Sequence, residues 1–312
     1  MRALLLVLLL LLCGCGDDSA SAGSKPSPSL PTELKPAADY SGDNAYVHCA
    51  ALCALGPRPS GSPAYREQVA YLASHLKQAG WQVQVQAFEP RAGRSMQNVH
   101  ATFGSSSAPR PLLLSCHIDT KQGLGDFVGA DDGASGAAAL LELARVLAAQ
   151  PQLAEQVELV FFDGEESFGS RITEDDGLYG SRYDVQRREQ LPRYLINLDM
   201  VGGAGKTIVV PVLDTSADLL EHYLETIAEL GLSEDRWTVY PGSFWDDHRP
   251  FFEAGVETLN LIADFHGSSW WHTSRDNLSR ISPNSLGETG RVVLQLIRRL
   301  LSRGSEGDDQ SS

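Results

Sequence analysis

Short, continuous apolar runs alternate along this chain with segments of helical period, and this alternation constrains the fold more than any other feature. The runs 111–116 and 157–162 are almost wholly apolar, as expected of central strands that are covered on both faces. The segment 134–149 between them is rich in Ala and Leu and is predicted to be helical. Strands that alternate with helices form a sheet between two helical layers. We therefore predict a single-domain, three-layer α/β sandwich with a mostly parallel, mixed central sheet.

The rest of the chain fits the same pattern. Ser62 as N-cap and Pro63 at the first helical position begin a helix that ends at Gly80, because apolar residues recur between them at three- and four-residue steps. No internal repeat, phosphate-binding glycine loop or Gly-x-Ser-x-Gly elbow occurs, so nucleotide binding and serine-hydrolase chemistry lack their usual markers. Further strands are predicted at 81–88, 96–103, 194–200, 207–212 and 257–263, and further helices at 217–230 and 282–302.

The first residues predict export. A charged start is followed by an apolar core, residues 3–13, which is too short for a bilayer that requires roughly 20 residues. The run Leu12-Cys13-Gly14-Cys15 is similar to the lipobox of bacterial lipoproteins, and Cys15, which follows a small residue, is the candidate for lipidation. A plain signal peptide with incidental cysteines is the alternative. We expect an exported bacterial lipoprotein of the cell envelope, periplasmic or on the outer surface, held to the membrane by the lipid on its new N-terminus.

Composition sets the boundaries of the folded part. Residues 1–14 are assigned to the signal peptide, and the Ser-, Pro- and Ala-rich stretch 15–43 to a flexible tether. Residues 44–303 form the predicted catalytic domain, and 304–312 are expected to be a disordered acidic tail. The chain has 40 Asp and Glu against 25 Lys and Arg, a net charge of −15, which disfavours nucleic acid as a partner because phosphates would be repelled. Nothing in the pattern indicates an oligomeric state.

Charged or imidazole side chains follow four of the predicted strands. Taken singly, each could cap a helix or lie on the surface. Ligands of an α/β sheet bind at the carboxyl ends of its strands, and buried charges are costly unless they are compensated. The set therefore predicts a metal site whose oxygen and nitrogen ligands suit zinc. In the adjacent Glu pair, one side chain can bind metal while the other moves a proton. The residues are His117, Asp131, Asp132, Glu165, Glu166, Asp199 and His272.

Several stretches around these residues are similar to one known group of enzymes. In their sequence and in their order along the chain, these stretches resemble the zinc exopeptidase superfamily. This superfamily contains the co-catalytic zinc aminopeptidases and the animal-type glutaminyl cyclases. The stretch 161–166, followed by 178–182, resembles the cyclase branch. The resemblance implies the phosphorylase/hydrolase-like, zinc exopeptidase fold. The stretches are 116–121, 128–132, 161–166, 178–182, 246–251 and 271–273.

The cyclase branch implies a specific reaction. The N-terminal glutamine of a peptide would be cyclised to pyroglutamate with release of ammonia. Glu165 would be the general acid/base, taking a proton from the attacking α-amine and returning it to the leaving ammonia. Asp199 would orient the amide nitrogen, with Asp246 supporting it. One Zn²⁺ would be held by three ligands, which are Asp132, Glu166 and His272.

The aminopeptidase branch implies a different use of the same residues. Two Zn²⁺ ions would be bridged by Asp132, with His117 and Asp199 on one ion and Glu166 and His272 on the other. The acid/base glutamate would then activate a water, and N-terminal residues would be hydrolysed from peptides. Both enzymes would act on peptides with a free N-terminus. A third hypothesis is a non-catalytic, peptide-binding lipoprotein of the same fold.

The chain departs from the cyclase pattern at three places. A Trp that lines the cyclase pocket has no counterpart between 167 and 177, where Arg171 lies nearest. Asn260 stands where the animal cyclases have a His, and a paired cysteine is reduced to Cys116 alone. Trp271, next to a predicted metal ligand, is expected to form a wall of the substrate pocket.

Overall fold

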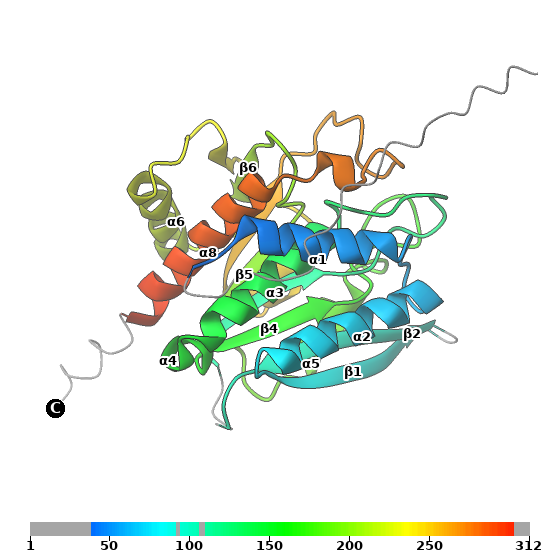
Figure 1. The fold of residues 1–312 in the computed structure, drawn as a ribbon, viewed down its shortest axis with the longest axis horizontal. Helices are drawn as coiled ribbons and strands as arrows, with labels where there is room; N and C mark the ends of the chain where they lie inside the picture. The colour runs from blue at the N-terminus through cyan, green and yellow to red at the C-terminus, as the bar shows by residue number, and fades with distance from the viewer. Residues whose placement is uncertain (1–38, 92–93, 106–109, 303–312) are drawn as a thin grey trace, which may run out of the picture. The chain divides into compact units, whose positions relative to one another are not determined.

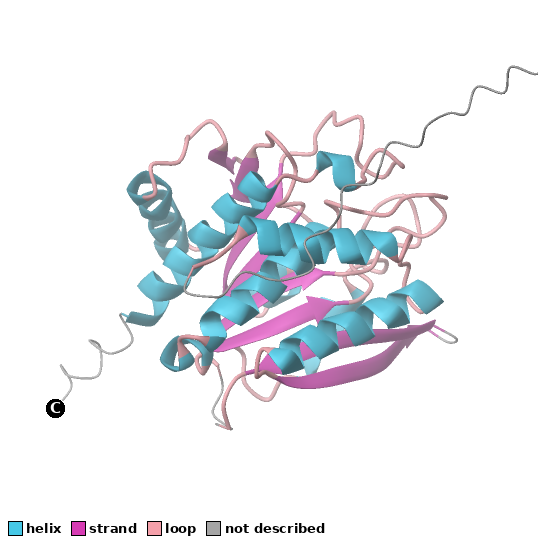
Figure 2. Ribbon diagram, in the orientation of Figure 1, coloured by secondary structure: helices cyan, strands magenta, loops and turns pink. Residues whose placement is uncertain are grey.

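A mixed sheet lies at the centre of the fold, between layers of helices (Figures 1 and 2). The structure, a computed structural model, describes residues 39–91, 94–105 and 110–302. The predicted signal peptide, most of the predicted tether and the predicted acidic tail lie outside the described residues. The described strands are β1 (Gln82–Arg91), β2 (Arg94–Thr102), β3 (Leu112–His117), β4 (Val157–Phe162), β5 (Tyr194–Asp199), β6 (Ile208–Pro211), β7 (Trp237–Tyr240) and β8 (Glu257–Ala263).

The strands are ordered β1-β2-β4-β3-β5-β8-β6-β7. The central strands β4, β3, β5 and β8 run parallel to one another, and β6 pairs in parallel with β7. Antiparallel pairs occur between β1 and β2, between β2 and β4, and between β6 and β8. The predicted mixed sheet with a mostly parallel centre is therefore confirmed.

Helices cover both faces of the sheet. Neighbouring residues of a strand point to opposite faces. Leu114 of β3 packs in the large core with the helices α1, α2, α3 and α8, whereas Leu113 packs in a smaller core with Phe251 of α7. The three-layer sandwich is confirmed. The described helices are α1 (Gly42–Ala54), α2 (Pro63–Gln78), α3 (Ala134–Ala148), α4 (Pro151–Ala154), α5 (Tyr179–Arg187), α6 (Ala217–Glu229), α7 (His248–Glu253) and α8 (Pro283–Ser302).

Local sequence explains where most of these elements begin and end. The apolar run 157–162 coincides with β4. Helix α2 begins with Pro63 after Ser62, whose side chain accepts a hydrogen bond from the main-chain N–H of Tyr65, as predicted. Helix α1 begins at Gly42, within the stretch assigned to the tether, because Ser41 caps it.

The short elements β7, α5 and α7 were not predicted. Helix α5 follows Leu178, which has a positive φ of 55°, and α7 follows Asp247; neither helix has a side-chain cap that a sequence pattern would reveal. Strand β7 has only four residues and alternates too briefly to be recognised. Their positions are set by packing: α5 contacts α7, and α7 contacts β5 and β8.

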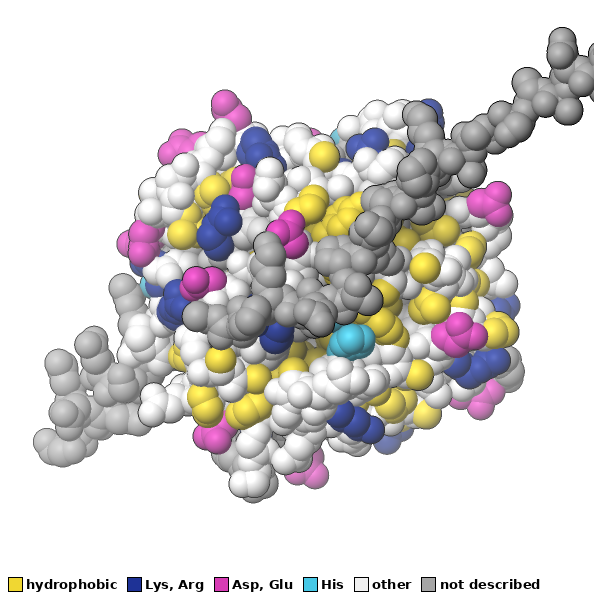
Figure 3. Space-filling model, viewed as in Figure 1, with side chains coloured by type: hydrophobic (Ala, Val, Ile, Leu, Met, Phe, Trp, Pro, Cys, Tyr) yellow, Lys and Arg dark blue, Asp and Glu magenta, His cyan; other side chains and the backbone are white. Residues whose placement is uncertain are grey.

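The surface in view carries mixed charges. On the face shown in Figure 3, the Lys and Arg side chains of the described residues are scattered among Asp and Glu and form no continuous basic area. Within the described ranges, no helix combines the length and the apolar character that a membrane span requires.

Candidate metal centre and active site

The candidate residues come together at one edge of the sheet. His117 is the last residue of β3 and Asp199 the last residue of β5, and these parallel strands end at the same edge. Glu165 and Glu166 lie in the loop after β4, which pairs with β3 on the side opposite β5. Strand ends thus position most of the set, as the sequence predicts for a parallel sheet.

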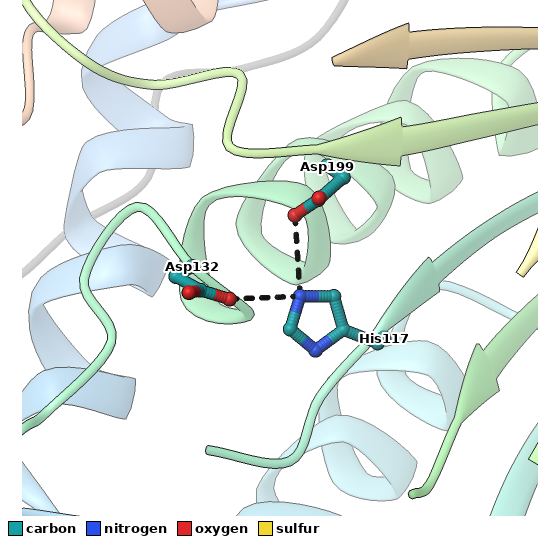
Figure 4. A group of neighbouring side chains, drawn as sticks. All are labelled: His117, Asp132 and Asp199. Atoms are coloured by element: carbon teal, nitrogen blue, oxygen red, sulfur yellow. Dashed lines mark hydrogen bonds and ion pairs between the residues drawn. The ribbon is translucent and has the colours of Figure 1, made fainter. Parts of the chain in front are cut away.

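One cluster is formed around His117 (Figure 4). Its Nε2 atom lies 3.2 Å from Oδ1 of Asp132 and 3.2 Å from Oδ1 of Asp199. All three side chains are buried. Burial alone would lower the pKa of His117, but hydrogen bonds with Asp119, Asp132 and Asp199 raise it well above its ordinary value.

A second cluster shares Asp132 with the first. Nε2 of His272 lies 3.1 Å from Oε1 of Glu166 and 3.5 Å from Oδ2 of Asp132. Asp132 therefore turns one oxygen toward each histidine. Burial would raise the pKa of Asp132, but the hydrogen bond and positive charge of His117 lower it below its ordinary value.

Both clusters fit zinc. Tetrahedral coordination at about 2.0–2.1 Å places neighbouring oxygen and nitrogen ligands roughly 3.3 Å apart. The separations of 3.1 to 3.5 Å between imidazole nitrogens and carboxylate oxygens agree with that spacing. Among the described residues, the buried Oδ2 atom of Asp132 accepts no hydrogen bond, which is costly unless a cation or another donor compensates it. The two groups of possible ligands are His117, Asp132 and Asp199, and Asp132, Glu166 and His272.

Two further buried carboxylates hold the loops that carry the candidate ligands. Asp119 accepts the main-chain N–H groups of Glu165 and Glu166, at 3.1 and 3.2 Å. Asp276 accepts those of Asp131 and Asp132, at 2.9 and 3.0 Å. Neither carboxylate was predicted to have a role. The sequence feature that could have revealed them is that each lies only a few residues from a histidine of the site. Each carboxylate fixes the main chain that carries a candidate ligand, as the outer partners of metal sites do.

Asp131 is not a ligand, and the alternative of a helix cap is wrong. Helix α3 begins at Ala134 with Gly133 as N-cap, and no side chain caps it by a hydrogen bond. Asp131 instead forms an ion pair with Lys206 and accepts the main-chain N–H of Gly202 at 2.8 Å. It thereby ties the loop after β5 to the turn that carries the metal-ligand candidate.

Glu165 faces the cavity with its carboxyl group. Its buried carboxyl lines the cavity, and within the described ranges no hydrogen bond to it is found. Burial, together with the charge of Glu166, raises the pKa of Glu165 well above its ordinary value. A divalent cation beside it would favour the ionised carboxylate and offset this effect. An unpartnered carboxyl with a raised pKa, facing a cavity, is typical of a general acid/base.

Asp199 and Asp246 belong to one buried polar network. Asp246 accepts hydrogen bonds from Nδ2 of Asn197 at 2.9 Å and Nδ2 of Asn260 at 2.8 Å. Burial raises the pKa of Asp199 to about 7, and the charge of Asp246 adds to this rise while the hydrogen bond with His117 opposes it. Asp246 thus acts on Asp199 through its charge. Asn260, the departure noted in the sequence, supplies one of the donors.

A cavity of about 580 Å³ opens onto both clusters, a size within the range of small-ligand sites. Trp271 lines it and stacks on the ring of His272, with ring centroids 4.0 Å apart. Arg171 also lines the cavity, in the loop where the cyclase pattern has a Trp. The other aromatic walls were not predicted, because they come from loops far along the chain from the one that carries Arg171; they are Phe244, Trp245 and Phe265.

Two residues of the site have a left-handed backbone. His272 has a φ of 55° and Met200, directly after Asp199, a φ of 51°. Such a conformation costs of order 1–3 kcal/mol for residues other than glycine and persists only where surrounding contacts fix it. Its presence at two cavity-lining positions agrees with a functional constraint on the site.

The model of the peptidase family M28 matches residues 98–297, which contain every candidate ligand. The chain belongs to peptidase family M28. Membership of this family agrees with the resemblance seen in the sequence. Zinc is therefore the metal expected at the site.

Named relatives of this M28 chain include cyclases and an exopeptidase. This chain is 32% identical over 282 residues to glutaminyl-peptide cyclotransferase of Bos taurus, and the match covers 76% of each chain. The solved glutaminyl cyclase of Porphyromonas gingivalis is 31% identical with a TM-score of 0.77, covering 84% of this chain and 99% of that one. A Zn-dependent exopeptidase of Parabacteroides distasonis is 28% identical with a TM-score of 0.74, covering 83% and 98%. The predicted fold and superfamily are confirmed.

Proposed function

We propose that this protein is a zinc-dependent glutaminyl-peptide cyclotransferase, which converts N-terminal glutamine of peptides to pyroglutamate. The observation that carries the proposal is the position of Glu165: an unpartnered buried carboxyl in a cavity beside the cluster of Asp132, Glu166 and His272. The similarity to bovine and bacterial cyclases, over most of each chain, favours cyclisation among the reactions that such a site can perform.

In this reaction the α-amine of the N-terminal glutamine attacks its own γ-carbonyl carbon. A C–N bond to the α-amine forms, and the bond to the amide nitrogen breaks. Asp132, Glu166 and His272 would hold the zinc, which would supply a Lewis acid for the γ-carbonyl when bound. Glu165 takes a proton from the α-amine and delivers it to the departing ammonia. Asp199 accepts a hydrogen bond from the amide nitrogen and holds it in position.

The aromatic walls serve the same reaction. Trp271 and Phe265 are 4.8 Å apart between ring centroids and line the cavity beside the candidate ligands. An apolar wall excludes water, which favours intramolecular attack by the amine over hydrolysis. It also holds the aliphatic part of the glutamine side chain near the reacting groups.

We propose one zinc ion per chain, in the cluster that contains His272. A second candidate function, a dizinc aminopeptidase, is favoured by one specific observation. His117 and Asp199 lie 3.2 Å apart and share Asp132 with the other cluster, so the geometry also suits a second ion.

Substrate preference separates the two functions. Purified protein is incubated with a glutaminyl peptide and, separately, with a leucyl amide. Cyclisation releases ammonia and leaves a pyroglutamyl peptide, which mass spectrometry identifies. Release of free leucine without any pyroglutamyl product would contradict the proposal and support the aminopeptidase. Activity on neither substrate would favour the non-catalytic binding protein.

We also propose that the protein is exported and held to the membrane by lipid on Cys15. Support comes from the short apolar leader and from the small residue that precedes this cysteine. Mass spectrometry of the mature N-terminus is expected to find acyl chains on Cys15. Cys15→Ala should release the protein from the membrane fraction, whereas Cys13→Ala, its neighbour, should not.

A further inference from the structure

A second cavity adjoins the one that contains the candidate metal ligands. It measures about 480 Å³, and two residues, Glu174 and Trp245, line both cavities. The shared lining places the two cavities side by side, with the Trp245 side chain between them. The remaining walls come from α5 and α7, which pack against each other, and are formed by Arg182, Val185, Gln186, Arg249, Pro250, Glu253 and Ala254.

Trp245 is exposed at this junction. Its side chain is 39% exposed, although it is one of the largest apolar side chains. The guanidinium of Arg249 lies 4.5 Å from the centre of its ring and holds the indole in place. Trp and Arg are among the residue types enriched at the positions that contribute most to binding energy in protein interfaces.

The wall of the second cavity is held in place by Arg182. Its guanidinium donates to the main-chain oxygen of Thr173 at 2.8 Å and to that of Glu174. These hydrogen bonds fix the loop that separates the two cavities. A wall that is already ordered reduces the entropy lost on binding.

The lining chemistry suits a peptide main chain. Arg182 and Arg249 are balanced in charge by Glu174 and Glu253, so a charged side chain gains little. Gln186 offers both a donor and an acceptor, as a peptide main chain requires. The cavity is therefore better suited to peptide groups of any sequence than to one charged residue type.

An enzyme that acts on a peptide N-terminus encloses the first residue, and the rest of the chain must leave through the mouth. An extended peptide advances about 3.3–3.6 Å per residue, so residues two to four span roughly 10 Å. We propose that the second cavity binds the main chain of these residues, with Trp245 as the wall over which the peptide passes. The inference rests on the proposed action at peptide N-termini and holds for cyclisation and for aminopeptidase hydrolysis alike.

The test compares substrates of different length. KM is measured for a glutaminyl dipeptide amide, which carries only the first of the three residues assigned to the second cavity, and for a pentapeptide amide with the same first two residues. In the wild-type protein the pentapeptide is expected to have a KM about tenfold lower. Ala254→Trp, which fills the second cavity, is expected to raise the pentapeptide KM to that of the dipeptide. Gln186→Ala, at an exposed position where the substitution leaves the fold undisturbed, should likewise raise the pentapeptide KM toward that of the dipeptide.

The matched control is Phe252→Ala. Phe252 is an exposed aromatic residue of α7 that lines neither cavity, so the ratio of the two KM values should stay at its wild-type value. Equal KM values for both lengths in the wild-type protein would overturn the inference. An unchanged ratio in both Ala254→Trp and Gln186→Ala would do the same.

Failure of the proposed cyclisation is recognised separately, because the wild-type protein would then form no pyroglutamyl peptide from either substrate. Binding of the intact pentapeptide, measured by calorimetry, then decides the inference. Weaker binding by Gln186→Ala than by Phe252→Ala supports the second cavity as the peptide site. Equal binding by the two variants excludes it.

Discussion

Asp276→Asn is expected to weaken zinc binding without touching a metal-ligand candidate. The Asp276 carboxylate is fully buried and accepts the main-chain N–H groups of Asp131 and Asp132, at 2.9 and 3.0 Å. An Asn keeps one acceptor oxygen but turns its NH₂ group toward the second N–H. One buried donor then loses its partner, which costs about 1–3 kcal/mol. The turn that carries Asp132 must shift to relieve this.

The expected loss of zinc affinity follows from the position of Asp276 beside the main chain that carries Asp132. Partners that orient a metal ligand change metal affinity by about 10–100-fold when they are lost. Zinc affinity is measured by competition with a chromophoric chelator at pH 8. Burial raises the pKa of Asp276 to about 7, so at this pH the wild-type side chain is mainly a carboxylate.

Two outcomes separate this account from a general loss of stability. Asp264→Asn removes an exposed carboxylate from the same loop and should leave zinc affinity unchanged. Asp276→Asn should lower zinc affinity at temperatures where circular dichroism shows the variant fully folded. Wild-type zinc affinity in Asp276→Asn would refute the role given to this carboxylate.

Three further predictions concern the acid/base, acid stability and the metal. Glu165→Gln should lower turnover of a glutaminyl peptide at least about 100-fold while zinc content stays at the wild-type value, since proton transfer contributes about 10²–10⁴-fold to the rate. Glu189→Gln, at an exposed position, is the control. Turnover by Glu165→Gln within a factor of two of the wild-type value would argue against the acid/base role. Burial would raise the pKa of Glu158, but hydrogen bonds from His100 and Arg188 lower it to about 2 from 4.5. Because the pKa is depressed in the folded state, its stabilisation is complete above pH 4.5 and is lost as the pH falls toward 2, by about 3 kcal/mol at most. The free energy of unfolding, measured by urea titration at several pH values across that range, should depend less on pH in Glu158→Gln than in the wild type. The same pH dependence in both proteins would count against this ion pair. Removal of zinc with a chelator should lower the Tm, because the clustered carboxylates then repel one another; an unchanged Tm would show that the cluster does not bind zinc.

The fold and the edge that carries the site follow from local sequence. The run 157–162 is apolar except for Glu158 and coincides with β4, because a strand buried on both faces needs no regular alternation. The residues at or just beyond the carboxyl ends of β3, β4 and β5 could be grouped before their contacts were known, since the carboxyl ends of parallel strands lie at the same edge of the sheet. His117, Glu165 and Asp199 belong to that group.

The features that escaped prediction depend on contacts between distant segments. Asp276 lies 144 residues from Asp132 in the chain and contacts its main chain, a pairing that no local pattern encodes. Strand β2 pairs antiparallel with β4, a partner and a direction that its own composition does not indicate. Trp245 lines the cavities because α7 packs on β5 and β8, and its sequence neighbours alone do not indicate that position.

The most direct test of the central claim is a titration of metal-free protein with zinc, followed by ammonia release from a glutaminyl peptide and by leucine release from a leucyl amide. The account predicts that ammonia release rises in proportion to added zinc and reaches its maximum at one equivalent per chain, with no leucine released. A maximum at two equivalents, accompanied by leucine release and no pyroglutamyl product, would contradict it and identify a dizinc aminopeptidase.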